Sequence, residues 1–228
     1  MNKQKVIWVD GHQHPHGDRG ATIHETTEAR QNVEVGDEAV LRFAVLSDIE
    51  FLRCPVELGG QDEIDWVNAH ANNDTIVISC HHNACDDERA SGVEAFYYNG
   101  NARGQKLAEM ICERIASKTG QKNRGAKIES QSQHKSIGII SKTKGTAVLV
   151  ECGFLTNSYD KKHILDPTLD NAFSEAIFEA VMEFLGLEVV VTPELKDDPL
   201  EEQKKIIAEI IEKTRVALSE IENFIEDL

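Results

Sequence analysis

The chain has 228 residues, 40% of them hydrophobic, which suits one compact domain of ordinary size with a possible appendage and excludes a large multidomain assembly. Forty acidic residues against 24 basic ones give a formal net charge of −16. Because nucleic acids and anionic membranes attract basic surfaces, this balance argues against nucleic acid as a partner and against simple adsorption on a membrane.

The first apolar run of the chain, Val6 to Val9, is only four residues long before Asp10 interrupts it. Such a run is too short for a signal peptide or a membrane span. We therefore expect synthesis in the cytoplasm without a signal peptide and without insertion into a membrane. Five cysteines, an odd number without CxxC spacing, predict free thiols rather than a disulfide framework.

Short β-branched runs alternate with amphipathic stretches up to about residue 190, which predicts an α/β domain. We expect a twisted, mainly parallel (mixed) sheet of about six strands flanked by helices. In chain order, the predicted elements are a strand at Val6–Asp10, a helix at Glu28–Leu46, strands at Glu50–Arg53, Thr75–Cys80 and Gly92–Tyr98, a helix at Gly104–Thr119, strands at Ile137–Ser141 and Thr146–Glu151, and a helix at Asn171–Leu185.

A charged segment with two prolines, TPELKDDP, interrupts the pattern and predicts a linker at residues 191–199 after a catalytic domain at residues 1–190. Residues 200–228 then carry apolar side chains at seven-residue spacing, which predicts a C-terminal amphipathic helix. Its broad apolar face fits either docking on its own domain or assembly into a homo-oligomer. Both alternatives stay open at this point.

Three of the predicted strands are nearly unbroken apolar runs, as expected of strands covered by helices on both faces, and each ends in chemically active side chains. Ligands of open α/β sheets bind beyond the carboxyl ends of the strands, so these side chains should meet at one rim. Imidazole and carboxylate groups together predict a divalent metal site, and the absence of a thiolate pair favours catalytic zinc. The candidates are Asp10, His12, His81, His82 and Glu151.

Several motifs, in this order and spacing, resemble the zinc-dependent N-acetylmuramoyl-L-alanine amidases of peptidoglycan, the family called amidase type 3. The resemblance covers roughly residues 5 to 186 and depends on whole motifs in their expected strand contexts. The motifs are DGH at residues 10–12, SCHHNA at 79–84, GVEAFYYN at 92–99, NRGAK at 123–127 and VECGF at 150–154.

The resemblance implies a role for individual residues. His12 and His81 match the first and third zinc ligands of the family. Glu28 is preferred as the second ligand, because it opens a predicted helix and is followed four positions later by Asn32, as in the family pattern. The alternatives for this ligand are Glu25 and Glu34.

Glu151 matches the catalytic acid/base of the family. Two neutral imidazoles and one carboxylate leave Zn²⁺ with a positive charge and an open position for water, and a nearby unligated carboxylate can then move the proton. The resemblance also implies that Asn83, Asn123 and Arg124 belong to the substrate groove, although a plain surface turn explains residues 123–125 nearly as well.

The sequence departs from the family pattern after the first histidine, where GHQHPHGDRGA carries His14 and His16 and is about two residues longer. We interpret this segment as an exposed turn, since a further ligand would close the position that water needs. Alternation along a strand places His82 on the face opposite His81, where it would have a structural or supporting role, and it turns Cys80 and Cys152 into the core.

The resemblance implies hydrolysis of the amide that joins N-acetylmuramic acid to L-alanine, with peptidoglycan as the partner. Without a signal peptide the enzyme would reach the wall by another route, as a bacteriophage endolysin does after holin-type release. The alternatives are a zinc peptidase acting on another amide of the wall peptide, a non-catalytic wall-binding relative, and a structural protein organised by its terminal helix.

Overall fold

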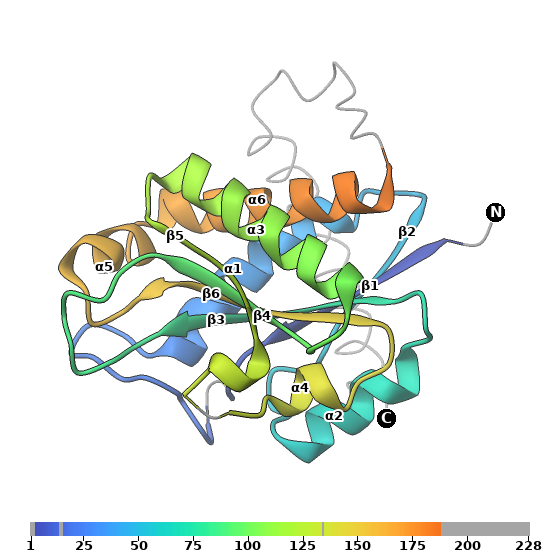
Figure 1. The fold of residues 1–228 in the computed structure, drawn as a ribbon, viewed down its shortest axis with the longest axis horizontal. Coiled ribbons are helices and arrows are strands. Elements are labelled where there is room, and N and C mark those ends of the chain that lie inside the picture. The colour runs from blue at the N-terminus through green and yellow to red at the C-terminus, as the bar shows by residue number, and fades with distance from the viewer. Residues whose placement is uncertain (1–2, 14–15, 134, 188–228) are drawn as a thin grey trace, which may run out of the picture. The chain divides into compact units, whose positions relative to one another are not determined.

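The computed structural model describes residues 3–13, 16–133 and 135–187. In these ranges one sheet is covered by helices on both faces (Figure 1). The elements in chain order are β1 (Gln4–Asp10), α1 (Glu28–Phe43), β2 (Ile49–Arg53), α2 (Gln61–His70), β3 (Ile76–Asn83), β4 (Val93–Tyr97), α3 (Ala102–Thr119), β5 (Asn123–Ile128), a 3₁₀ turn (Glu129–Gln131), α4 (Gly138–Ser141), β6 (Thr146–Phe154), α5 (Ser158–Ile164) and α6 (Pro167–Leu185).

The sheet has six strands in the order β2-β1-β3-β6-β4-β5. Strands β2, β1, β3 and β6 are mutually parallel, whereas β4 runs antiparallel to β6 and β5 runs parallel to β4. The mixed α/β sheet predicted from the sequence is confirmed. The carboxyl ends of β1, β3 and β6 lie at the same edge, which brings their terminal residues together.

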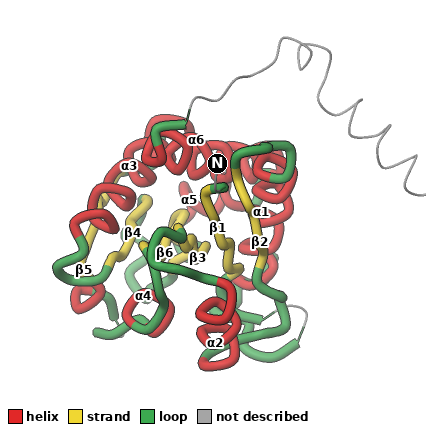
Figure 2. The backbone as a smooth tube through the Cα atoms, turned by 90° about the vertical axis from the view of Figure 1, so that its right-hand side faces the viewer, coloured by secondary structure: helices red, strands yellow, loops and turns green. Residues whose placement is uncertain are grey.

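Helices α1, α3 and α6 cover one face of the sheet, and α2 and α4 cover the other (Figures 1 and 2). Strand β1 shows why both faces are apolar: Val6 and Trp8 belong to the core beneath α1, whereas Ile7 and Val9 belong to the core beneath α2. All four side chains are buried. The unbroken apolar runs of the central strands therefore reflect coverage from two sides.

One predicted strand is wrong. Residues Ile137–Ser141 contain the short helix α4, whose Ile139 and Ile140 are both buried in the core that α2 shares. A short apolar run has no periodicity long enough to distinguish a buried strand from a buried helical turn. The strand that completes the sheet is instead β5, which was not predicted as a strand: residues 123–125 were expected to belong to the substrate groove, with a surface turn as the alternative.

Two further helices, α2 and α5, were not predicted. Helix α2 buries only Ile64 and Val67, so its apolar stripe is too sparse to stand out. The predicted linker at 191–199 and helix at 200–228 lie outside the described residues. No helix within the described ranges has an apolar stretch long enough to cross a bilayer.

Candidate functional site

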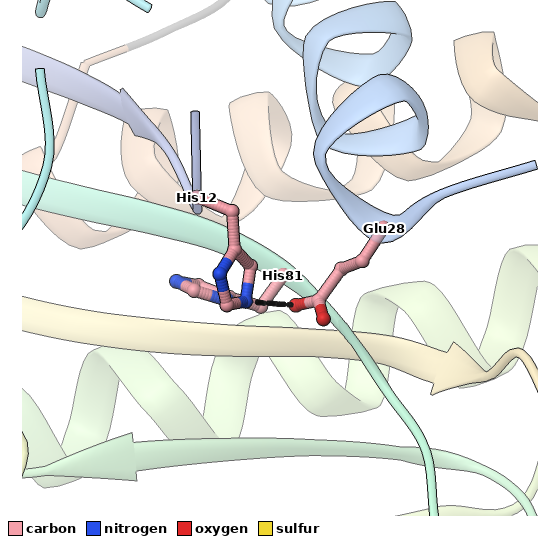
Figure 3. Close-up of side chains that lie close together, drawn as sticks. All are labelled: His12, Glu28 and His81. Atoms are coloured by element: carbon pink, nitrogen blue, oxygen red, sulfur yellow. Dashed lines mark hydrogen bonds and ion pairs between the residues drawn. The ribbon is translucent and has the colours of Figure 1, made fainter. Parts of the chain in front are cut away.

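Three candidate metal ligands come together at the edge where β1 and β3 end (Figure 3). His12 follows β1, His81 lies on β3 and Glu28 is the first residue of α1. Their ligand atoms all lie within 4.8 Å of one another. One carboxylate oxygen, Oε1 of Glu28, is 2.9 Å from Nδ1 of His81 and 3.1 Å from Nε2 of His12.

Glu28 is fixed by the start of its helix. Thr27 caps α1 by accepting a hydrogen bond from the backbone N–H of Arg30, which places Glu28 in the first turn. The second carboxylate oxygen, Oε2, accepts the backbone N–H of Ala21 at 3.0 Å. Oε1 is thereby left to face the two histidines.

Two glycines make room for this group. A Cβ on Gly11 would lie 2.2 Å from the ring of His81, so only glycine lets that ring pack against the end of β1. Gly20 has φ +64°, and a Cβ there would lie 2.5 Å from Oε2 of Glu28. His12 itself adopts φ +66°, which turns its imidazole back toward Glu28.

Hydrogen bonds and charges within the group shift the pKa values of His12 and Glu28. Burial disfavours the imidazolium of His12, but hydrogen bonds to Glu28 and Asp18 outweigh burial and raise the pKa of His12 to about 9. Burial likewise opposes the charged form of Glu28, yet hydrogen bonds from His12 and His81 hold the pKa of its carboxyl well below the usual range. Asp18 approaches the other nitrogen of His12, with Oδ2 3.1 Å from Nδ1.

The donor set fits a zinc ion. Two imidazole nitrogens and one carboxylate oxygen form a set that catalytic zinc sites use, and such a set leaves one position open. In metal sites, a carboxylate that binds the second ring nitrogen of a ligating histidine fixes the orientation of the imidazole. Asp18 has this position relative to His12. Asp18 was not predicted as a site residue, although it lies in the segment GHQHPHGDRGA, where the sequence departs from the family pattern.

The other glutamates considered as the second ligand lie elsewhere. Glu25 pairs with Lys161 at 3.0 Å, and Glu34 pairs with Arg30 at 2.8 Å. Neither joins the histidines within the described part of the chain. Glu28 is therefore the one of the three that the fold places beside His12 and His81.

Asp10 does not join the ligand group. Its carboxylate is buried and accepts hydrogen bonds from Trp8 Nε1 at 3.0 Å and from Arg53 Nε at 2.6 Å. These contacts tie β1 to β2 below the site. His14 lies outside the described residues, and His16 is exposed.

His82 lies on the face opposite His81, as strand alternation predicts. Its Nδ1 is 2.8 Å from Oδ1 of Asn32, and the amide Nδ2 of Asn32 donates to the carbonyl of Gly11 at 2.8 Å. Because the Asn32 oxygen must accept, we assign the proton of His82 to Nδ1. Burial lowers the pKa of His82 to about 4, so the ring is neutral at pH 7.

Two cysteines beside the candidate residues are core side chains. Cys80 and Cys152 are fully buried on the α1 side of the sheet, turned away from His81 and Glu151. Their sulfur atoms are 3.9 Å apart. The placement predicted by alternation is confirmed.

Glu151 lies on β6 directly beside His81 on β3. Its Oε2 is buried and accepts no hydrogen bond within the described residues. Burial, together with the carboxylates of Glu28 and Glu94, raises the pKa of Glu151 well above its usual range. A carboxyl group in this environment holds a proton more readily than an exposed one does.

A groove of about 600 Å³ runs along this edge of the sheet. His12, Glu28 and Glu151 line one part of it. The remainder combines apolar side chains with polar ones, among them Asn83, Glu94, Arg124 and Lys127. The candidate groove residues Asn83 and Arg124 are thus part of its wall.

Asn123 does not line this groove. Its side chain is exposed and accepts the backbone N–H of Gly125 at 2.8 Å, so it supports the strand rather than facing the cavity. Two charged groove residues, Glu94 and Lys127, were not predicted, although both lie inside motifs that carry the family resemblance. The sequence signal that could have identified these two residues is a charged side chain in the middle of a short strand.

A family model described as N-acetylmuramoyl-L-alanine amidase, amidase type 3, matches residues 9–183. The chain belongs to this family. The match includes both candidate histidines, Glu28 and Glu151, and it ends inside α6.

Among curated proteins, the N-acetylmuramoyl-L-alanine amidase LytC of Bacillus subtilis is 28% identical over 112 residues, which cover 48% of this chain and 21% of that protein. The match therefore spans about a fifth of that relative. Among solved structures, an N-acetylmuramoyl-L-alanine amidase of Clostridium difficile 630 has TM-score 0.71 at 22% identity, covering 82% of this chain and 98% of the other. The catalytic domain of the CD27L endolysin, which targets Clostridia difficile, has TM-score 0.62 at 23% identity, covering 79% and 97%.

Proposed function

We propose that this protein is a zinc-dependent N-acetylmuramoyl-L-alanine amidase, which hydrolyses the amide between N-acetylmuramic acid and L-alanine in peptidoglycan. The observation that carries the proposal is the grouping of His12, Glu28 and His81 within 4.8 Å, beside the unligated carboxyl of Glu151 on the adjacent strand. Membership of the amidase family supports the choice of bond.

His12, Glu28 and His81 would hold the zinc ion. When bound, zinc would polarise the scissile carbonyl and would also lower the pKa of a water molecule so that it ionises near neutral pH. Glu151 would take the proton of the attacking water and deliver it to the leaving nitrogen of L-alanine. Its raised pKa favours holding the proton between these two transfers.

The test is digestion of purified peptidoglycan by the zinc-loaded protein, with products identified by mass spectrometry. The amidase reaction releases stem peptides with a free L-alanine amino terminus and leaves unsubstituted glycan. A chelator should abolish the release, and added zinc should restore it. Amino termini from any other residue would instead identify a zinc peptidase, and no metal-dependent release would identify a wall-binding relative.

For the biological setting we propose an endolysin that reaches the wall from the cytoplasm after holin-type release. The fold shared with the catalytic domain of the CD27L endolysin supports this setting. Expressed inside bacteria, the protein should then lyse cells that also produce a holin much faster than cells that do not. Equal and slow lysis of both would contradict the setting without touching the proposed reaction.

A further inference from the structure

The groove has a cationic end that the proposed chemistry does not use. Arg124 and Lys127 of β5 both donate to Oε2 of Glu94 on β4, and Asn83 donates to Oε1 at 2.8 Å. All four residues line the groove. We propose that Arg124 and Lys127, held in place by Glu94, bind a carboxylate of the stem peptide. This inference rests on the proposed amidase function.

Strand register puts this cluster beside the catalytic end. Glu94 of β4 pairs with Glu151 of β6, and Phe96 pairs with Lys127 of β5. Paired residues of neighbouring strands point to the same face, and Glu94 and Phe96 are two residues apart on one strand. Lys127, Glu94 and Glu151 therefore share a face, and the two functional ends of the groove are one strand apart.

An irregularity in β5 adds Arg124 to the same face. Val93 pairs with Asn123 and Glu94 pairs with Gly125, so Arg124 is an extra residue in the ladder. A bulge of this kind redirects a side chain that regular alternation would send to the other face. Gly125 adopts φ +79°, a conformation that glycine adopts without strain. The guanidinium also lies 4.8 Å over the ring of Phe154, which restricts its orientation.

The charges of the cluster do not cancel. Glu94 is 4% exposed and brings one negative charge against the two positive charges of Arg124 and Lys127. The two cationic side chains are 26% and 28% exposed, so part of each faces the groove. The ammonium has three N–H donors and the guanidinium five, and most of them are not used by Glu94. A local excess of one positive charge thus remains in a chain whose net charge is −16.

The chemistry of the substrate identifies what this excess would bind. On the sugar side of the scissile bond, the lactyl carboxyl group is consumed in the amide itself. On the peptide side, the second residue of the stem carries a carboxylate unless it is amidated, and so does the third where it is a diamino dicarboxylic acid. Charge-assisted hydrogen bonds from arginine and lysine favour carboxylates over amides. The inference therefore also orients the substrate, with its peptide toward β4 and β5 and its glycan toward the opposite end of the groove.

The test uses the full-length zinc-loaded protein and four synthetic N-acetylmuramoyl tripeptides. The carboxylate of the second residue is either free or amidated, and independently the carboxylate of the third residue is either free or amidated, which gives the four compounds. We expect kcat/KM to be at least about tenfold higher for the free carboxylate at one of the two positions, mainly through KM. The position that matters identifies which carboxylate is bound.

Lys127→Met should reduce this preference to less than about threefold, and Lys127→Arg should restore it. Lys106→Met, which removes the same charge from the exposed face of α3, is the matched control and should keep the preference. Equal hydrolysis of all four substrates by the wild-type protein, or an undiminished preference in Lys127→Met, would overturn the subsite alone. Failure to hydrolyse any of the four would remove the proposed function together with it.

Discussion

The two ends of the groove are built on different principles. At the β1–β3 end, His12, His81 and Glu28 come from three separate segments of the chain. Both imidazoles approach the same carboxylate oxygen, Oε1 of Glu28. At the β4–β5 end, Arg124 and Lys127 come from one edge strand and converge on a single buried partner, Glu94. The first arrangement offers a metal its ligands, whereas the second supplies its own counter-ion and leaves positive charge for a substrate.

The largest effects are expected at the first end. His81→Ala should abolish both stoichiometric zinc binding and turnover, because it removes a ligand. Glu151→Gln should lower turnover by about 10²–10⁴-fold while zinc stays bound, because only the proton carrier is lost. Metal analysis of both purified variants alongside product release separates the two roles. Full activity in Glu151→Gln would remove Glu151 from the mechanism.

A smaller effect is expected from the network behind the ligands. His82 and Asn32 link the end of β1, the first turns of α1 and the end of β3, which are the three segments that carry the ligands. His82→Leu should weaken zinc binding by about 10–100-fold, as loss of outer contacts of metal ligands does. Competition with a chelating dye measures this affinity.

His82→Asn offers a matched control, because its amide can still donate to Asn32 from nearly the position of the imidazole Nδ1. Recovery of affinity in His82→Asn would assign the effect to the hydrogen bond. The free energy of unfolding of the metal-free variants, measured in urea, shows whether packing alone is responsible. Equal zinc affinity in wild type and His82→Leu would mean that the network does not position the ligands.

Two carboxylates outside the ligand group have contrasting surroundings. Glu94 is buried and accepts three donors, whereas Glu63, half-buried in the first turn of α2, forms no hydrogen bond or ion pair within the described residues. Burial raises the pKa of Glu63 to about 7. In the unfolded chain this group ionises at a lower pH, so the unfolded state releases its proton first as the pH rises.

The free energy of unfolding of the metal-free protein should therefore fall between about pH 4.5 and pH 7, by on the order of 1–3 kcal/mol from this group. Glu63→Gln should remove that part of the decrease, measured by urea denaturation at pH 5 and pH 7.5. Asp62→Asn, at the exposed neighbouring position, is the control and should keep it. An unchanged pH dependence in Glu63→Gln would show that Glu63 is better solvated than its surroundings indicate.

The smallest effect on catalysis is expected from residues 199–228. The seven-residue pattern predicts a helix that either docks on its own domain or joins copies of the chain. If it joins copies, deletion of Pro199–Leu228 should lower the molecular mass measured by light scattering. Hydrolysis of small soluble substrates should change little, whereas lysis of whole walls should decrease, because several linked catalytic domains bind a wall with higher avidity. An unchanged molecular mass would refute assembly through this segment.

The sequence predicted the β1–β3 end of the groove far better than the β4–β5 end. Strands β1, β3 and β6 are apolar on both faces, so their runs were easy to recognise and their ends could be placed at one rim. The choice among Glu25, Glu28 and Glu34 depended on the resemblance to a family, since a glutamate in an amphipathic helix is ordinarily a solvated charge.

At the other end, local sequence carried little information. Strand β5 is partly exposed along most of its length, and Arg124 shares a face with Lys127 only through a bulge that no pattern of two-residue alternation contains. The error at Ile137–Ser141 has a related origin, because two buried isoleucines fit a strand and a helical turn equally well. Strand pairing decided the first case, and packing in the core decided the second.

The placement of His12 and Glu28 has a consequence for handling the protein. They stand at the two ends of one connecting segment, which runs from the end of β1 to the start of α1. An ion bound to both residues would restrain the two ends of that segment, whereas the hydrophobic core of the sheet does not depend on the ion. Susceptibility of this stretch to a protease would then report how much of a preparation is loaded, without any substrate being needed.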